Sequence, residues 1–95
     1  MSFFMKELAR KKIRSISADE LLKFARQYEF QVKRMEAEQI VHYLRNTSQD
    51  PFLAADRKKI FSELAQITDP KTARQAEKLF YQLIKSYGVE HLFEY

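Results

Sequence analysis

The sequence has no cysteine and no tryptophan, and its 95 residues include one glycine and two prolines. Without cysteine there can be no disulfide framework, no cysteine-ligated zinc site and no thiol chemistry. One glycine is too few for the glycine-rich loops that hold phosphate groups, which argues against phosphate-loop enzymes. A chain without cysteine fits a reducing compartment, and we expect a cytoplasmic protein.

Long apolar runs are lacking as well. The N-terminal stretch MSFFMKEL reaches Lys6 too soon to form the core of a signal peptide or a membrane-spanning helix. No stretch alternates β-branched and polar residues for the length of a strand. The chain is instead rich in Ala, Leu, Glu, Lys, Gln and Arg, the residues that favour helices. These features predict an all-α fold.

The stretch SISADELLKF contains a signal for the start of a helix. Ser17 and Glu20 have the spacing of a capping box, and Ile16 and Leu21 can form a hydrophobic staple across it. Apolar residues then recur at steps of three and four, which predicts a helix over residues 18–28.

Other helices follow from the same periodicity. The expected ranges are 3–13, 34–45, 51 or 54 to 67, and 70–87. Asp50 and Asp69 each stand before a proline, as an N-cap stands before the first helical residue, and Gly88 fits a left-handed helix stop. The short connections predict a single small helical domain over residues 1–95, a compact bundle or orthogonal array of four to five short helices. It has a basic N-terminal helix (about 3–13) and a short apolar tail (89–95).

The inward positions of these helices define an expected core. Its members are Leu21, Leu22, Ala25, Ile40, Val41, Leu44, Phe61, Leu64, Phe80, Leu83 and Ile84. Phe24 and Tyr87 fall on the same stripes and are also expected inside. The charged stretch from Asp56 to Lys59 is expected to be a solvated face.

Positive charge is concentrated at the start of the chain. The net charge of +4 comes from 17 basic and 13 acidic residues, and residues 1–14 hold five basic residues against Glu7 alone. The candidate contacts for an anion or nucleic acid are Arg10, Lys11, Lys12 and Arg14. With Phe3, Phe4, Met5 and Leu8 opposite, the same segment could lie at a bilayer interface. Basic residues in the last turn of a helix also simply complement its dipole.

The expected helices over 18–28 and 34–45 have about the dimensions of a helix-turn-helix. Their connection, EFQVK, is longer than the usual turn and lacks glycine. In addition, Glu36 and Glu38 cancel the charges of Arg34 and Arg45 on the second helix, where a clear positive excess is expected for contact with phosphates. Nucleic-acid binding therefore stays an alternative.

Chemistry-bearing residues are few. His42 and His91 are the only imidazoles and stand on separate elements; Glu38 stands four residues before His42, a spacing that metal ligands can have and that is common by chance. No nucleophile motif or paired acidic motif is present. We expect no catalytic residue, no cofactor, no metal site and no enzymatic activity.

Some aromatic residues fall off the inward stripes. These candidates for a partner surface or a self-association patch are Tyr43, Tyr81, Phe93 and Tyr95. The expected function is a non-enzymatic module that binds another protein, with nucleic-acid binding through the basic segment and the helix-turn-helix-like pair as the alternative.

Three segments carry a resemblance to a known family. ISADELLKFARQY, AEQIVHYLR and ITDPKTARQAEKLFYQL, in this order, resemble the small YqfT-like family of Firmicute proteins over about residues 8–85. The resemblance implies a short, helical, cytoplasmic bacterial protein of unknown function, without catalytic or binding residues to carry over. The chain departs from the expected pattern at Lys33, where a Ser, Thr or Asp cap is expected before the third helix.

Overall fold

The structure is a computed structural model that describes residues 2–95. It contains five α-helices and one short 3-10 helix, and the described chain forms no strand, which confirms the all-α prediction. The elements are α1 (Ser2–Ser15), α2 (Ala18–Gln27), α3 (Arg34–Asn46), α4 (Ala54–Ile67), α5 (Pro70–Ser86) and η1 (Glu90–Leu92).

Local signals set the helix ends. The hydroxyl of Ser17 accepts a hydrogen bond from the backbone N–H of Glu20, and the Glu20 carboxylate accepts one from the N–H of Ser17, which confirms the capping box. The Asp69 carboxylate caps α5 through the N–H of Thr72. Gly88 follows α5 with φ +68°, the left-handed conformation that glycine adopts without strain.

The third helix begins without a side-chain N-cap, as the lysine at this position in the sequence indicates. Lys33 occupies the N-cap position of α3 and its side chain makes no capping hydrogen bond. The carboxylate of Glu36 accepts the N–H of Lys33 instead, at 2.8 Å. Half of a capping box is therefore enough to start α3 at Arg34.

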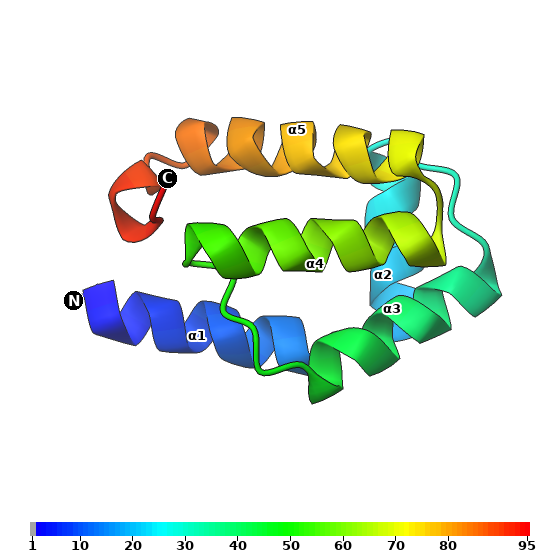
Figure 1. Cartoon of the computed structure of the whole chain (residues 1–95), viewed down its shortest axis with the longest axis horizontal. Coiled ribbons are helices and arrows are strands. Elements are labelled where there is room, and N and C mark those ends of the chain that lie inside the picture. Colours follow the sequence, from blue (N-terminus) through cyan, green and yellow to red (C-terminus); the bar gives the residue numbers. More distant parts are fainter. Residues whose placement is uncertain (1) are drawn as a thin grey trace.

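The five helices pack into a compact array, as the sequence predicts. Helices α4 and α5 form an antiparallel hairpin, α2 crosses behind their far end, and α3 lies along the lower side (Figure 1). Helix α1 packs chiefly against α3. Both ends of the chain lie at the same end of the molecule, where η1 closes over the start of α4 (Figure 1).

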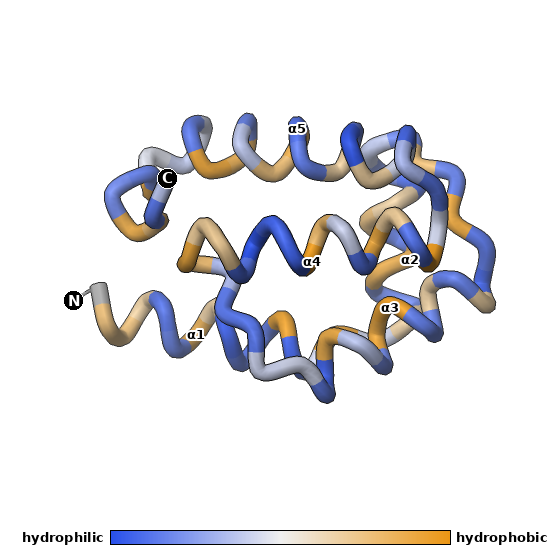
Figure 2. The backbone as a smooth tube through the Cα atoms, in the orientation of Figure 1, coloured by the Kyte–Doolittle hydropathy of each residue, from blue (hydrophilic) through white to orange (hydrophobic). Residues whose placement is uncertain are grey.

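The core is small. The turns of α5 that face α4 are apolar and those that face away are polar (Figure 2). The buried apolar residues in the described chain are Ala25, Ala37, Ile40, Val41, Phe52, Ile60, Ala73, Ile84 and Leu92. Four of these belong to the core expected from the sequence, whose other members, including Leu21, Leu44, Phe61 and Phe80, are only half-buried.

Three expectations about single residues are wrong. Arg57 lies in the stretch expected to be solvated, yet it is 3% exposed because the C-terminal tail folds over it. Tyr87 was expected in the core but is 74% exposed, since nothing in the described chain covers its ring. Phe24 is also expected in the core but is 41% exposed; its ring packs at a tilt against Tyr28, with centroids 4.7 Å apart.

The molecule exposes more surface than its size predicts. Its accessible surface is 6829 Å² for a mass of 11.4 kDa. A folded monomer of this mass exposes about 5800 Å². The surplus of roughly 1000 Å² indicates that the chain buries less of its own surface than a typical monomer of this mass.

Candidate functional site

A buried arginine joins the C-terminal tail to the helical hairpin. The guanidinium of Arg57 donates hydrogen bonds to the Tyr81 hydroxyl at 3.0 Å, to the carbonyl of Pro51 at 2.9 Å and to the carbonyl of Glu94. It also lies 5.6 to 5.9 Å from the ring centroids of Tyr81, Phe93 and Tyr95, within the range of cation–π attraction. The Arg57 charge is thus held by neutral acceptors and aromatic faces.

The tail is fixed by further contacts around this arginine. The N–H of Glu94 donates to the carbonyl of Phe52 at 2.8 Å, and the Glu94 carboxylate accepts the N–H of Ala54 at 2.9 Å. Through the second bond a carboxylate sits at the start of α4, where it interacts favourably with the helix dipole. The tail is therefore an integral part of the fold.

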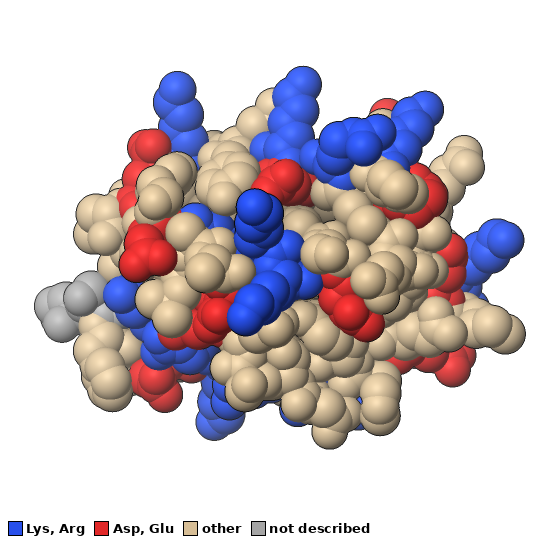
Figure 3. Space-filling model, viewed as in Figure 1, with Lys and Arg blue, Asp and Glu red and all other residues tan. Residues whose placement is uncertain are grey.

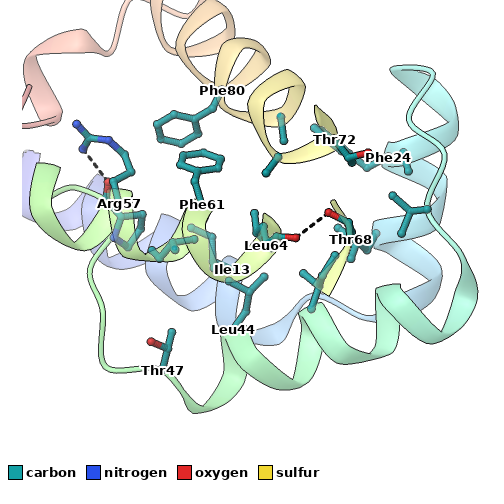
Figure 4. A pocket seen from close by; sticks show the side chains of 18 of the residues that line it. Ile13, Phe24, Leu44, Thr47, Arg57, Phe61, Leu64, Thr68, Thr72 and Phe80 are labelled. Carbon is teal, nitrogen blue, oxygen red and sulfur yellow. Dashed lines mark hydrogen bonds between the residues drawn. The ribbon is translucent and has the colours of Figure 1, made fainter. Parts of the chain in front are cut away.

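An apolar cavity of about 340 Å³ lies between the helices. Figure 4 shows Phe61 and Phe80 facing each other on one side, with Leu44, Leu64 and Ile13 around the remaining space. All five helices contribute to the lining, as do Phe30 and Val32 from the segment between α2 and α3. Leu21, Leu44, Phe61, Leu64 and Phe80, which are half-buried members of the expected core, all line this cavity.

The hydroxyl groups at the cavity wall are already used. Thr68 donates to the Leu64 carbonyl, and Thr72 donates to Asp69. Thr47 donates to the side-chain oxygen of Gln49, which also accepts from Tyr43. The wall therefore offers an occupant apolar contact more than hydrogen bonds.

A void of this size is a substantial energetic term. Cavities left in protein cores cost about 24 cal/mol per Å³, so 340 Å³ corresponds to at most roughly 8 kcal/mol. Whole domains are stable by about 5–15 kcal/mol. The cavity of this chain is partly open, which lowers the cost, but filling it would still stabilise the molecule.

The outward side of α1 is the second uncovered apolar surface. We call Phe3, Phe4, Met5 and Leu8 the α1 face; their exposed fractions are 75%, 66%, 44% and 54%. Phe4 and Leu8 lie one turn apart, Lys11 continues the same side of the helix, and Phe3 and Met5 flank this side. The opposite side, with Ala9 and Ile13, turns toward the rest of the protein.

The four basic candidate residues have different surroundings. Arg10 pairs with Glu7 at 2.7 Å and with Asp50 at 2.6 Å, and Lys12 pairs with Glu20 at 2.6 Å. Lys11 and Arg14 are exposed and form no ion pair with the described residues. The segment is thus partly neutralised by its own fold.

The ion pair between Arg10 and Asp50 ties α1 to the segment before α4. Burial alone would raise the pKa of Asp50, but hydrogen bonds from Arg10 and from the N–H of Phe52, together with the Arg10 charge, lower it. Arg10 and Lys6 also lie over the Phe52 ring, 5.1 and 5.5 Å from its centroid. Asp50 is therefore a structural carboxylate.

The four aromatic candidate residues do not form one surface. Tyr81 and Phe93 are half-buried around Arg57, and Tyr95 reaches the same cluster while its ring stays largely exposed. Tyr43 lies apart on α3 and bonds to Gln49. Tyr81 and Phe93 therefore have roles inside the fold, and sequence periodicity could not reveal them because the tail has no helical period.

The histidines remain isolated from each other. His42 lies on α3 beside Asn46, whose amide donates to the His42 carbonyl, and His91 is in η1. Within residues 2–95, no three His, Asp or Glu side chains gather as metal ligands would. In the same range, no helix has the length and apolar character to cross a membrane.

Charges are dispersed on the face seen in Figure 3. Lys and Arg side chains alternate there with Asp and Glu. This face therefore does not offer the continuous basic stripe that a nucleic-acid backbone would require.

Comparison with known proteins places the chain in a family. It matches the family described as "Protein of unknown function (DUF2624)" over residues 1–84. It is similar to "Uncharacterized protein YqfT" of Bacillus subtilis (strain 168), with 27% identity over 71 residues, 75% of this chain and 84% of that protein. No solved structure matches. These matches confirm the resemblance seen in the sequence, and the chain belongs to the DUF2624 family, whose function is unknown.

Proposed function

We propose that this chain is a non-enzymatic interaction module that docks a partner protein through the α1 face. The partner would offer an apolar groove for Phe3, Phe4, Met5 and Leu8, with acidic side chains at its rim. The observation that carries the proposal is the exposure of these four side chains on one well-formed helix.

The composition of the α1 face favours a protein groove. Phenylalanine and methionine are enriched at protein interfaces, and interface energy concentrates in a few large anchors. Two turns of α1 present four such anchors, while most other exposed apolar residues, such as Met35 and Tyr87, lie singly on other elements. A helix laid into an apolar groove is a common mode of recognition.

Charge favours an acidic partner over a second copy of this chain. Lys11 lies on the same side as Phe4 and Leu8, and the nearby Glu7 is already bonded to Arg10. Two α1 faces in contact would bring Lys11 near an equally basic segment.

Nucleic-acid binding remains the alternative reading of the basic segment. Arg10 and Lys12 would have to leave their carboxylate partners to contact phosphates, which weakens their contribution. In the helix-turn-helix-like pair, Arg34 of α3 is likewise paired, with Asp19 and Glu38. Lys11 and Arg14 alone would provide a weak, strongly salt-dependent contact.

The test compares variants in a quantitative pull-down from a Bacillus subtilis lysate. The bait is the full chain, a Phe4→Ser/Leu8→Ser variant, a Lys11→Glu variant, or the control Met35→Ser, which removes an exposed apolar side chain from α3. Nuclease-treated and untreated samples are run in parallel. Circular dichroism establishes that each bait is folded.

The proposal expects one stoichiometric protein that survives nuclease treatment. The wild type and Met35→Ser should retain it, the double serine variant should lose it, and Lys11→Glu should retain at least fivefold less. Retention by the double serine variant would refute the proposed surface. Recovery of nucleic acid alone would favour the alternative. If the chain bound anionic lipid vesicles and the double serine variant lost that binding to the same degree, a membrane would be favoured over a protein partner.

A further inference from the structure

The apolar cavity is large enough to bind a small molecule. We propose that it binds a medium-chain alkyl carboxylate of about ten to twelve carbons, with the chain inside the cavity and the carboxylate at Arg14. This site is separate from the α1 face, because the cavity is lined by Arg10, Ile13 and Arg14 of α1 and by none of the four residues of that face. The proposed ligand site can therefore be tested independently of the proposed function.

The size of the cavity sets the length of the chain. A methylene group occupies about as much space as a water molecule in the liquid, roughly 30 Å³. The cavity of about 340 Å³ thus holds roughly eleven such groups. It also falls within the range of ordinary ligand sites, about 300–1000 Å³.

The wall selects an alkyl chain over a polar ligand. Figure 4 shows aromatic rings of Phe61 and Phe80 and aliphatic side chains of Ile13, Leu44 and Leu64 around the space. The hydroxyls of the lining threonines donate to acceptors of the fold itself. A sugar or a nucleobase placed there would lose its hydrogen bonds to water without replacement.

One cation is in position to meet the head group. Arg14 lines the cavity and is exposed, so its long side chain can carry the guanidinium to the point where the cavity meets solvent. Within residues 2–95 its side chain makes no hydrogen bond or ion pair, whereas Arg10 is held by Glu7 and Asp50. Arg57 also touches the cavity, but its donors are bonded to the tail and to Pro51. A carboxylate at the mouth would therefore pair with Arg14.

The first measurement is a calorimetric titration of the full chain with octanoate, decanoate, dodecanoate and tetradecanoate below their micelle concentrations. Affinity should rise about tenfold for each two-carbon step up to ten or twelve carbons and then stop rising, because the cavity is full. Absence of saturable binding would overturn the proposal. So would a rise that continues unchanged to tetradecanoate, which is typical of non-specific adsorption.

Variants then locate the site. Ala76→Leu adds a side chain into the cavity and should weaken dodecanoate at least tenfold and shift the plateau to a shorter chain; Leu44→Phe gives the same test on α3 if Ala76→Leu does not fold. Arg14→Gln should weaken decanoate about three- to fivefold and leave neutral 1-decanol unchanged. Its matched control is Arg26→Gln on α2, away from the cavity lining.

Each variant result bears on one part of the proposal. Unchanged dodecanoate binding by both filling variants would exclude the cavity, and unchanged decanoate binding by Arg14→Gln would exclude the anionic head at that residue. Phe4→Ser/Leu8→Ser should bind dodecanoate like the wild type. This last result separates the cavity from the surface proposed to dock a protein.

Discussion

At the scale of single residues, Arg57 does the most to connect parts of the chain that are distant in sequence. Its guanidinium reaches Pro51 before α4, Tyr81 on α5 and Glu94 in the tail. A buried charge is tolerated only when its donors are satisfied, and here backbone carbonyls and a hydroxyl satisfy them. Removing the arginine would leave the tail without its main anchor.

We expect Arg57→Met to lower the free energy of unfolding by about 2–4 kcal/mol, because three hydrogen bonds to a charged donor are lost in a buried place. Arg57→Lys should lose nearly as much, since an ammonium cannot replace a planar group bonded in three directions. Urea unfolding at neutral pH measures the change, with exposed Lys58→Met as the control. Equal stability of Arg57→Met and wild type would show that the tail docks without this residue.

The lowered pKa of Asp50 predicts how the stability of the fold changes at acidic pH. Above the ordinary value of 3.8 the carboxylate is ionised in both states and its pairing with Arg10 stabilises the fold fully. As the pH falls below that value, the unfolded chain takes up the proton first, so this contribution declines. Asp50→Asn should therefore be less stable than wild type at pH 6 and should lose less stability between pH 5 and pH 3, as urea unfolding across that range would measure. Identical pH dependence would contradict this role.

The sequence could not indicate the burial of Arg57. The stretch from Asp56 to Lys59 is uniformly charged, and a local pattern of this kind is typical of a solvated face. Burial comes from Phe93 and Glu94, whose position depends on the turn at Gly88 and on the contact with Phe52. Such long-range closure has no local periodicity to reveal it.

At the scale of elements, helix ends were predictable because their signals are local. Ser17 with Glu20, and Asp69 with Pro70, fix the starts of α2 and α5 within a few residues of the chain. The periodicity predicted all five helices to within one or two residues at most ends. It could not predict that the α1 face would lie outward, since a stripe shows which residues share a side but not what covers that side.

The cap of α2 can be tested by itself. We expect Ser17→Ala to lower the free energy of unfolding by about 1 kcal/mol, because the N–H of Glu20 loses its partner. Ser15→Ala, two residues earlier and outside the capping box, should change it by less than about 0.5 kcal/mol. Thermal unfolding of the pair measures the difference. Equal effects would mean that tertiary packing, and not the cap, sets the start of α2.

The stop of α5 gives a second test at this scale. We expect Gly88→Ala to cost about 1 kcal/mol, from backbone strain alone, since φ is +68° and an added Cβ would meet no atom within 4 Å. Gly88→Asn should cost less, because asparagine tolerates the left-handed conformation. Urea unfolding distinguishes the two. A larger loss for Asn than for Ala would contradict strain as the cause.

At the scale of the whole molecule, the five helices leave an apolar space between them that their own side chains do not fill. The molecule exposes more surface than a typical monomer of its mass, and several expected core residues are half-buried beside the cavity. Both observations reflect incomplete packing between the helices. The sequence indicated which residues are apolar and inward, and this was correct for Ala25, Ile40 and Ile84. It could not indicate a space between them, because the distance between helices depends on packing that no single stripe contains.

Filling the cavity should stabilise the unliganded molecule. We expect Ala76→Leu to raise the free energy of unfolding by about 1 kcal/mol, as cavity-filling substitutions commonly do. Urea unfolding without added ligand measures it. Ala55→Leu, at an exposed position of α4, is the control and should change stability little. Destabilisation by Ala76→Leu alone would indicate that the space is too narrow for the added side chain.

The way α1 is attached has a consequence for assembly. It packs chiefly against α3 and reaches α2 through only Ile16 and Ser17. Two molecules that opened at this connection at high concentration could exchange their α1 helices, and each would then make the same ion pairs with the other's Asp50 and Glu20. The result would be a domain-swapped dimer that differs from the monomer only in connectivity, and that slow dilution would return to single chains.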